Sequence, residues 1–206
     1  MSQFFQVHPD NPQARLINRS VDILRDGGVI AYPTDSSYAL GCHIGDKASM
    51  ERIARIRQVS SRHNFTLVCR DLSEISTYAK VGNQEYRLMK SLTPGPFTFI
   101  LKASREVPRR LQNPKRKTIG LRVPENRIAH AMLEEHGEPI MSSTLILPND
   151  EFPMTDAEDI REQLEHLVDL VIDGGHCVNQ PTTVVDLSND SPAVTRQGRG
   201  IYEPFN

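Results

Sequence analysis

The first candidate binding site of this sequence is a polar segment that follows an apolar stretch and a proline. Residues 29–32 are apolar, and Pro33 cannot donate a hydrogen bond within a sheet, so it fixes the end of a strand. Four hydroxyl groups and one carboxylate follow directly: Thr34, Asp35, Ser36, Ser37 and Tyr38. A loop held at a strand end can bind a small polar ligand through directed hydrogen bonds, although the same residue types form ordinary turns.

Arginines provide the second candidate chemistry, which is the binding of an anion. Arg52 and Arg55 share one face of a helix expected to begin at Asp46, and Arg62 lies beyond it. Arg57 lies roughly 200° around that helix from Arg55, so the two converge on one ligand only if the helix unwinds near Ile56. A solvated basic helix face is the commoner structure for such a cluster.

Arg122 is a different case because it stands within an apolar run. Residues 118–123 read Thr-Ile-Gly-Leu-Arg-Val and end at Pro124, which is typical of a strand. An arginine that projects from a sheet without a partner is costly. Arg122 therefore needs an anionic partner, and this is either a protein carboxylate or a ligand.

The charge distribution also favours an anion site. Residues 50–131 contain 17 Lys and Arg against 6 Asp and Glu, a charge of +11, while the remainder carries −13 and the whole chain −2. The alternative is two solvated faces of opposite charge. Arginine outnumbers lysine in the basic section, and arginine is the better residue for forked contacts to phosphate or carboxylate. We therefore expect a cleft that receives an anion.

Common nucleotide and metal motifs are missing from the sequence. The run from Gly41 to Lys47 is too short for a phosphate loop, and no Ser or Thr follows the lysine. Cys42 and His43 are adjacent, as are His176 and Cys177, and neighbours on an extended chain point to opposite sides. Each pair offers at most one ligand, so we predict no metal site.

The elements that would position these residues alternate between helix and strand. Asn11 and Pro12 are expected to open a first helix, and residues 155–158 resemble a capping box for the last one. Helices are expected near 12–26, 46–56, 83–92, 126–136 and 155–164, and strands near 29–32, 65–69, 97–101, 118–123, 140–143, 167–172, 183–187 and 193–196. The pattern predicts one α/β domain over residues 1–206, with a twisted mixed sheet flanked by helices.

Length and composition indicate the class of protein and the cellular compartment that we expect. The 206 residues suit one domain, and 38% apolar with 24% charged residues is typical of a globular protein. The first residues lack the basic and apolar regions of a signal peptide, and no apolar run approaches the ~20 residues of a membrane helix. Three cysteines without framework spacing predict a reduced, cytoplasmic protein without disulfides. From the missing apolar run we expect no association with membranes.

Three segments together carry a family resemblance. They are the loop of residues 33–41, the corner Thr93-Pro-Gly-Pro96 that opens into residues 97–101, and residues 118–124. Further agreement comes from Ser142 and Ser143, from residues 173–175 and 181–186, and from residues 196–198. In this order, from about residue 28 to 198, the chain resembles the YrdC-like family of threonylcarbamoyl-AMP synthases, and most closely its YciO branch. The resemblance implies a YrdC-like α/β fold with a basic concave cavity.

The resemblance also implies a reaction. Such enzymes join L-threonine, bicarbonate and Mg²⁺-bound ATP into threonylcarbamoyl-adenylate and pyrophosphate, for the modification of adenosine-37 in tRNA. By position, the substrate-binding residues would be Thr34, Tyr38, Arg122, Ser142 and Thr182. Those facing ATP would be Arg57, Thr118, Thr144 and Arg196, and the catalytic arginines would be Arg55, Arg57 and Arg122.

Several positions depart from the synthase pattern. Arg55 stands where the pattern has lysine, and Thr144 and Ile146 stand where it has serine and asparagine. An aliphatic side chain offers neither an acceptor to Mg²⁺ nor a donor to phosphate. We therefore expect a weakened synthase, or a protein that kept binding and changed its chemistry.

Binding of double-stranded RNA or tRNA is the alternative function. The family resemblance suggests it, and the basic stretch of residues 105–117 includes side chains that could contact phosphates: Arg109, Arg110, Lys115, Arg116 and Lys117. Few aromatic residues interleave them, so stacking on single-stranded bases is not indicated. A solvated loop explains the same residues equally well. The oligomeric state cannot be read from the sequence.

Overall fold

Ten strands hydrogen-bond into one mixed sheet in the computed structural model, which describes residues 1–60 and 63–202. The strand order is β1-β8-β2-β3-β7-β4-β6-β5-β9-β10. The strands are β1 (Gln3–Gln6), β2 (Ile30–Pro33), β3 (Tyr38–His43), β4 (Thr66–Val68), β5 (Phe97–Lys102), β6 (Thr118–Arg122), β7 (Ile140–Thr144), β8 (Leu170–Asp173), β9 (Thr183–Asp186) and β10 (Ala193–Arg196). The α-helices are α1 (Ala14–Arg25), α2 (Lys47–Ile56), α3 (Leu72–Tyr78), α4 (Asn83–Leu92), α5 (Arg127–His136) and α6 (Ala157–Leu164), and η1 (Arg109–Leu111) is a 3₁₀ turn.

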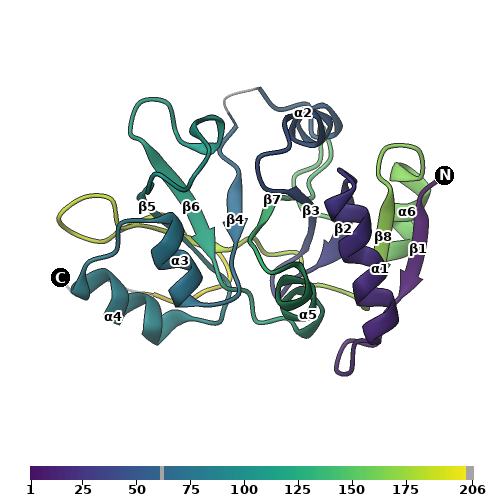
Figure 1. Ribbon diagram of the computed structural model, residues 1–206, viewed down its shortest axis with the longest axis horizontal. Coiled ribbons are helices and arrows are strands. Elements are labelled where there is room, and N and C mark those ends of the chain that lie inside the picture. The colour runs from purple at the N-terminus through teal and green to yellow at the C-terminus, as the bar shows by residue number, and fades with distance from the viewer. Residues whose placement is uncertain (61–62, 203–206) are drawn as a thin grey trace.

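The sheet contains both parallel and antiparallel strand pairs. β2 and β3 form a hairpin around the loop at residues 34–37, and β3 continues the antiparallel run onto β7. β4 pairs antiparallel with β7 but parallel with β6. The expected mixed α/β sheet flanked by helices is therefore confirmed (Figure 1).

Two hydrophobic clusters cover the two faces of the sheet. Successive residues of a strand point to opposite faces. Accordingly Ile30 and Tyr32 of β2 pack with α1 and α5, whereas Val29 and Ala31 belong to the cluster that contains α2 and α6. The hairpin loop and the inner strands are thus held on a sheet with a core on both sides.

The hairpin strand β3 was not predicted from the sequence, which placed its residues in a loop. Gly41 lies inside β3, where a glycine normally argues against a strand. A Cβ at this position would come within 2.9 Å of both Ile140 Cγ2 and Tyr32 Cε1, so the close packing of neighbouring strands requires glycine here. The near-match to a phosphate loop between Gly41 and Lys47 is accordingly part strand and part helix.

Two helix starts also differ from the expectation. α1 begins at Ala14 with Gln13 as its N-cap, later than the predicted start at Asn11 and Pro12. α6 is capped by the Asp156 carboxylate, which accepts from the backbone N–H groups of Glu158 and Asp159, instead of by the residue before it. β1 and α3 were not predicted. Within the described residues, no helix combines the length and apolar character that crossing a membrane requires.

Candidate functional site

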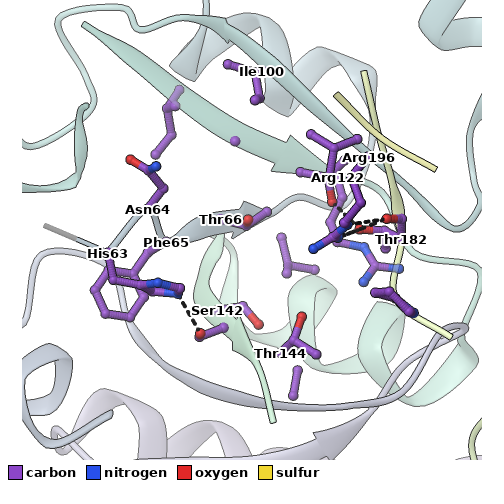
Figure 2. Close-up of a pocket in the computed structure, with 18 of the residues that line it drawn as sticks. His63, Asn64, Phe65, Thr66, Ile100, Arg122, Ser142, Thr144, Thr182 and Arg196 are labelled. Atoms are coloured by element: carbon purple, nitrogen blue, oxygen red, sulfur yellow. Dashed lines mark hydrogen bonds between the residues drawn. The ribbon is translucent and has the colours of Figure 1, made fainter. Parts of the chain in front are cut away.

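A cavity of about 360 Å³ opens on one face of the sheet, and we call it the central cavity. Its lining comes from β3, β7, β4, β6, β5, β9 and β10, with further residues from the end of α2 and from the connection between β5 and β6. Figure 2 shows His63, Asn64 and Phe65 on one side, with Arg122, Arg196 and Thr182 across from them.

The floor of the central cavity follows from the register of the strands. Thr66 of β4 stands opposite Gly120 of β6 on one side and Ser142 of β7 on the other. Residues directly opposite in a sheet face the same side, and so do residues two apart along a strand. Small and hydroxyl side chains therefore line the floor: Thr66, Thr98, Thr118, Gly120, Ser142 and Thr144. These small side chains leave room for a ligand above the sheet.

The end of α2 decides which of its arginines reaches the cavity. The helix ends at Ile56, and Gln58 has a left-handed backbone with φ of 49°. Arg57, the C-cap residue, lines the central cavity, whereas Arg55 is exposed and lies outside it. The structure therefore does not bring Arg55 to the cavity with the other predicted site residues, because α2 ends at Ile56 and only Arg57 lies at the lining. Arg62 lies outside the described residues.

Arg57 is held by neighbours that carry no charge. Its Nη1 donates to the Ser143 hydroxyl and lies 3.0 Å from His63 Nε2, and its Nε lies 3.4 Å from the Ile146 carbonyl oxygen. His63 Nε2 is also 3.2 Å from the Ser143 hydroxyl. Burial, together with the Arg57 charge, lowers the pKa of His63 to about 4, so the imidazole is neutral near pH 7. Burial also lowers the pKa of Arg57.

Arg122 forms an ion pair with a carboxylate of the protein itself. Its Nη2 donates to the carboxylate of Asp35, and its Nη1 lies 3.3 Å from the Ser36 hydroxyl. Both charged side chains are buried, at 8% and 6% exposure. The Nε of Arg122 has no hydrogen-bond partner in the described part of the chain. Of the two options that the sequence left open, the structure shows the carboxylate, and the buried Nε–H is left without a partner among the described residues.

Thr34 lines the central cavity, but its hydroxyl is used by its own loop. It donates to the Ser37 carbonyl at 2.7 Å and accepts from the backbone N–H groups of Ser36 and Ser37, each at 3.2 Å. The group therefore fixes the loop that carries Asp35, and through Asp35 it fixes Arg122. Thr34 shapes the site more than it offers a free hydrogen bond.

Two other predicted substrate residues also make contacts within the fold. Ser142 lines the cavity and accepts from the Tyr32 hydroxyl at 2.9 Å while its own hydroxyl reaches the Leu40 carbonyl at 3.2 Å. Burial raises the pKa of Tyr32 to about 12. Tyr38 is fully buried, lies outside the lining and donates to the Gly175 carbonyl. The structure therefore does not bring Tyr38 to the cavity, because Tyr38 begins a strand and packs in the core.

Arg196 and Thr182 form the wall opposite His63. Arg196 Nη2 donates to the Thr182 carbonyl at 2.9 Å and to its hydroxyl at 3.1 Å. The Thr182 hydroxyl lies 2.8 Å from that of Thr98. Burial lowers the pKa of Arg196, and the nearby charge of Arg122 lowers it further. Two guanidinium groups thus lie near each other at this wall.

The charges around the central cavity are not balanced. Its described lining contains four arginines and no Asp or Glu. Arg122 pairs with Asp35, and Arg116 pairs with Asp186 at 2.7 Å. Across residues 1–60 and 63–202, no carboxylate lies within ion-pair distance of Arg57 or Arg196. The positive charges of the partly buried Arg57 and of the exposed Arg196 therefore lack a counter-charge among the described residues, and this favours an anionic ligand.

The remaining predicted nucleotide residues are Thr118 and Thr144. Both line the central cavity, and so does Ile146, which contributes an aliphatic surface beside Arg57. Arg109, Arg110, Lys115 and Lys117 are exposed and lie outside the lining. Arg116 differs from them because it reaches Asp186 and lines the cavity.

Sequence reasoning missed several polar residues of this site. His63 and Asn64 were not selected, because a lone histidine and an asparagine in a loop carry no pattern. Thr66 and Thr98 lie in short strands, where a threonine is an ordinary residue. Ser143 gave a weak signal, since it belongs to the same serine pair as Ser142. Only the three-dimensional fold brings these residues to one cavity.

Comparisons with known proteins agree with this architecture. Residues 22–198 match the family model Sua5–YciO–YrdC, described as "Telomere recombination". The uncharacterized protein YciO of Escherichia coli (strain K12) is 62% identical over the full length of both chains. The crystal structure of E. coli YciO superposes with a TM-score of 0.94 and covers 98% of each chain.

Relatives with a named activity are more distant. A threonylcarbamoyl-AMP synthase of Chromobacterium violaceum is 34% identical over 137 residues, which are 66% of this chain and 70% of that protein. The crystal structure of P. abyssi Sua5 complexed with L-threonine has a TM-score of 0.88 at 24% identity, and the match covers 96% of this chain and 58% of that one. At this identity the structural likeness concerns the fold.

Proposed function

This chain belongs to the Sua5–YciO–YrdC family, and from that membership we propose that it binds L-threonine, or a related small molecule, together with ATP in the central cavity. We further propose that it forms threonylcarbamoyl-adenylate, at a rate lowered by Thr144 and Ile146. Kinship to a threonylcarbamoyl-AMP synthase and a fold shared with a Sua5 that was crystallised with L-threonine support this reading.

One observation carries the proposal: Arg57 and Arg196 line a single cavity without any carboxylate partner among the described residues. The proposed reaction brings several negative charges together. These are the carboxylate of threonine, the carbamate formed on its amine and the phosphates of ATP. Guanidinium groups in a partly buried site bind such groups strongly, because charge-assisted hydrogen bonds are about twice as strong as neutral ones.

The geometry suggests a role for each end of the central cavity. Arg57, with Ser143 and the neutral His63 beside it, would contact the phosphates. Arg122 lines the cavity and would contact the carbamate or carboxylate through its guanidinium, and Thr182 and Arg196 lie on the same side. Asp35 compensates the charge of Arg122 and holds it in place, so the guanidinium would act as an oriented donor more than as a free charge.

The chemical step would need positioning instead of a protein nucleophile. A carbamate oxygen attacks the α-phosphorus of ATP, a new O–P bond forms, and the bond from that phosphorus to pyrophosphate breaks. Negative charge grows on the phosphate oxygens, where fixed positive groups stabilise it. The described lining offers no carboxylate to a metal, so Mg²⁺ would enter as part of Mg²⁺-ATP, held by phosphate oxygens.

The deciding experiment is pyrophosphate release from ATP, measured with and without L-threonine and bicarbonate. We expect release that requires both and that disappears in Arg122→Ala. Isothermal titration with L-threonine alone tests binding separately from turnover. Binding without release would leave a binding protein with altered chemistry, and the absence of both would refute the proposal.

RNA binding is a second candidate, supported by the position of the basic segment at residues 105–117. Leu111, Asn113 and Arg116 of this segment line the cavity, while Arg109, Arg110, Lys115 and Lys117 stay exposed. The exposed charges therefore lie in the connection from β5 to β6, which also contributes residues to the lining of the central cavity. A phosphate backbone could contact them while a nucleotide approaches the site.

Salt dependence tests this second function. If RNA duplexes bind, log affinity falls linearly with log salt, and charge reversal at Arg109, Arg110, Lys115 and Lys117 weakens all RNA sequences alike. Lys90→Glu, an exposed change on α4, is the control and leaves affinity unchanged. Affinity that does not respond to salt would contradict electrostatic binding.

A further inference from the structure

A cluster of metal-binding side chains lies outside the central cavity. His43, His136 and Glu138 each offer one ligand atom, and these three atoms lie within 4.8 Å of one another. None of the three residues lines the central cavity. Sequence spacing predicted no metal site because it considered only neighbouring residues, whereas the partners of His43 lie more than 90 positions along the chain.

The fold brings these residues together through one helix end and one strand register. His136 is the last residue of α5, and Gly137 follows with a left-handed φ of 80° that reverses the chain. Ile140, two residues after Glu138, pairs with His43 across β7 and β3. The turn and the pairing together place the Glu138 carboxylate beside His43. The cluster therefore stands at the opposite end of the β3–β7 ladder from Thr144.

Distances within the cluster match those of a tetrahedral zinc site. His43 Nδ1 lies 3.3 Å from His136 Nε2, which is long for an N–H···N hydrogen bond. Two imidazole nitrogens on one Zn²⁺, each about 2.0–2.1 Å from the ion, are separated by about 3.3–3.4 Å. The two rings meet edge to face at 85°, so their nitrogens converge while the rings avoid stacking. The Glu138 oxygen is 3.8 Å from His43 Nδ1, on a side chain that is 39% exposed and free to approach.

The surroundings of His136 also favour a cation. This histidine is only 5% exposed, its Nδ1 has no partner within the described residues, and its ring makes a single polar contact, to His43. A buried imidazole with so few partners is costly, and a shared metal ion would satisfy its Nε2. The carboxyl end of α5 adds the negative end of a helix dipole. Arg25 opposes this, but its guanidinium is held by the carbonyls of Glu135 and His136.

We propose that His43, His136 and Glu138 bind one Zn²⁺ ion, with water at the fourth position. Two nitrogens and one carboxylate suit zinc, while Mg²⁺ prefers six oxygen ligands, so the Mg²⁺ that accompanies ATP would not occupy the site. Cys42 is not a ligand, because its buried thiol points to the other face of β3. The bound ion would join the end of β3 to the end of α5 and stabilise the fold.

Titration of the chelator-treated, full-length protein with ZnCl₂ tests this site. We expect saturable binding of one equivalent, a higher melting temperature with Zn²⁺, and no such rise with Mg²⁺. Side-chain NMR of the ring nitrogens adds a direct readout, in which Zn²⁺ shifts those of His43 and His136 only. Binding of no zinc at micromolar concentrations, or shifts at other histidines alone, would overturn the assignment.

Variants separate this site from adventitious binding. His43→Ala should lower zinc affinity by about 100-fold or more, and Glu138→Gln by about tenfold, since even outer-shell partners of a metal contribute about 10–100-fold. His166→Ala, an exposed histidine on another surface, is the matched control and keeps full affinity. His43 and Glu138 are only partly buried, so their variants should fold. They therefore test the site even if a variant of the buried His136 does not fold. Equal affinity in His43→Ala and His166→Ala would refute the proposal.

Discussion

Arg122 of β6 and Asp35 of the β2–β3 loop, 87 residues apart, form a buried ion pair at the wall of the central cavity. The same Asp35 carboxylate also accepts from the backbone N–H of Glu125 at 2.9 Å. The pair therefore joins the polar loop to the end of β6 and orients the guanidinium. It also means that the charge of Arg122 is already compensated before any ligand binds.

The ion pair leads to a prediction about stability. Asp35→Asn or Arg122→Met alone should lower the free energy of unfolding by about 3–5 kcal/mol, because each leaves one buried partner without its counter-charge. The double variant should lose less than the sum of the two, since no uncompensated charge remains. Urea unfolding measures all three. Arg55→Ala, on the exposed face of α2, is the control and should change stability by at most about 0.5 kcal/mol. Additive losses would contradict the pairing.

Arg57 and Arg55 make a matched pair for testing the anion site. Arg57→Ala should weaken pyrophosphate binding by about 10- to 150-fold, the equivalent of losing about 1.5–3 kcal/mol of charge-assisted hydrogen bonding. Arg55→Ala removes the same charge two residues away, outside the cavity, and should leave the affinity within about twofold. Isothermal titration measures both. Similar losses in the two variants would mean that general charge, and not the cavity, holds the anion.

His63 predicts a dependence of stability on pH. Burial and the charge of Arg57 lower its pKa to about 4, against an ordinary value of 6.5. Between these two values the unfolded chain binds the proton better, so His63 makes the fold less stable as pH falls from about 6.5 to about 4. Unfolding in urea at several pH values should show this loss, and His63→Asn should reduce it. NMR titration should give a higher pKa for His63 in Arg57→Ala. A pKa near 6.5 in the unmodified protein would contradict the described contacts.

Much of the fold was readable from local sequence because its signals are local. Pro33 and Pro124 mark the ends of β2 and β6, and Asp46 and Asn126 cap α2 and α5. These signals depend on backbone geometry within a few residues. β3 was not predicted because its signal is not local. A glycine is required at position 41 only by the close contacts with Tyr32 and Ile140, which lie on neighbouring strands.

The site could be predicted only in part, because its contacts span the chain. The sequence indicated that Arg122 needed an anion but could not tell that Asp35 would supply it. It stated that Arg55 and Arg57 would converge on one ligand only if the helix unwound near Ile56. The helix α2 does end at Ile56, but only Arg57 lines the cavity. His63 and Thr98 carried no pattern, and a tertiary contact alone identifies them.

We predict that Thr144 and Ile146 limit the synthase chemistry of this cavity. Both line it, and the Ile146 carbonyl lies 3.4 Å from Arg57 Nε, so the residue is close to the proposed phosphate end. An aliphatic side chain there stabilises no charge. If the synthase pattern holds phosphate or Mg²⁺ through an asparagine at this position, its loss costs about 10²–10³ in rate. Unmodified protein should therefore form threonylcarbamoyl-adenylate far more slowly than a relative with that asparagine.

The double variant Ile146→Asn and Thr144→Ser tests this explanation directly. It should raise threonine-dependent pyrophosphate release, because the amide can bind the charge that the isoleucine cannot. The Thr144 carbonyl accepts from the Ile146 backbone N–H at 3.1 Å, a contact that neither substitution removes, so the loop should keep its course. Ile146→Val is the control for a change of side-chain size alone and should leave the rate low. Adding Arg122→Ala to the double variant should abolish the gain. Full activity in the unmodified protein, or an unchanged rate in the double variant, would show that these two positions do not limit the chemistry.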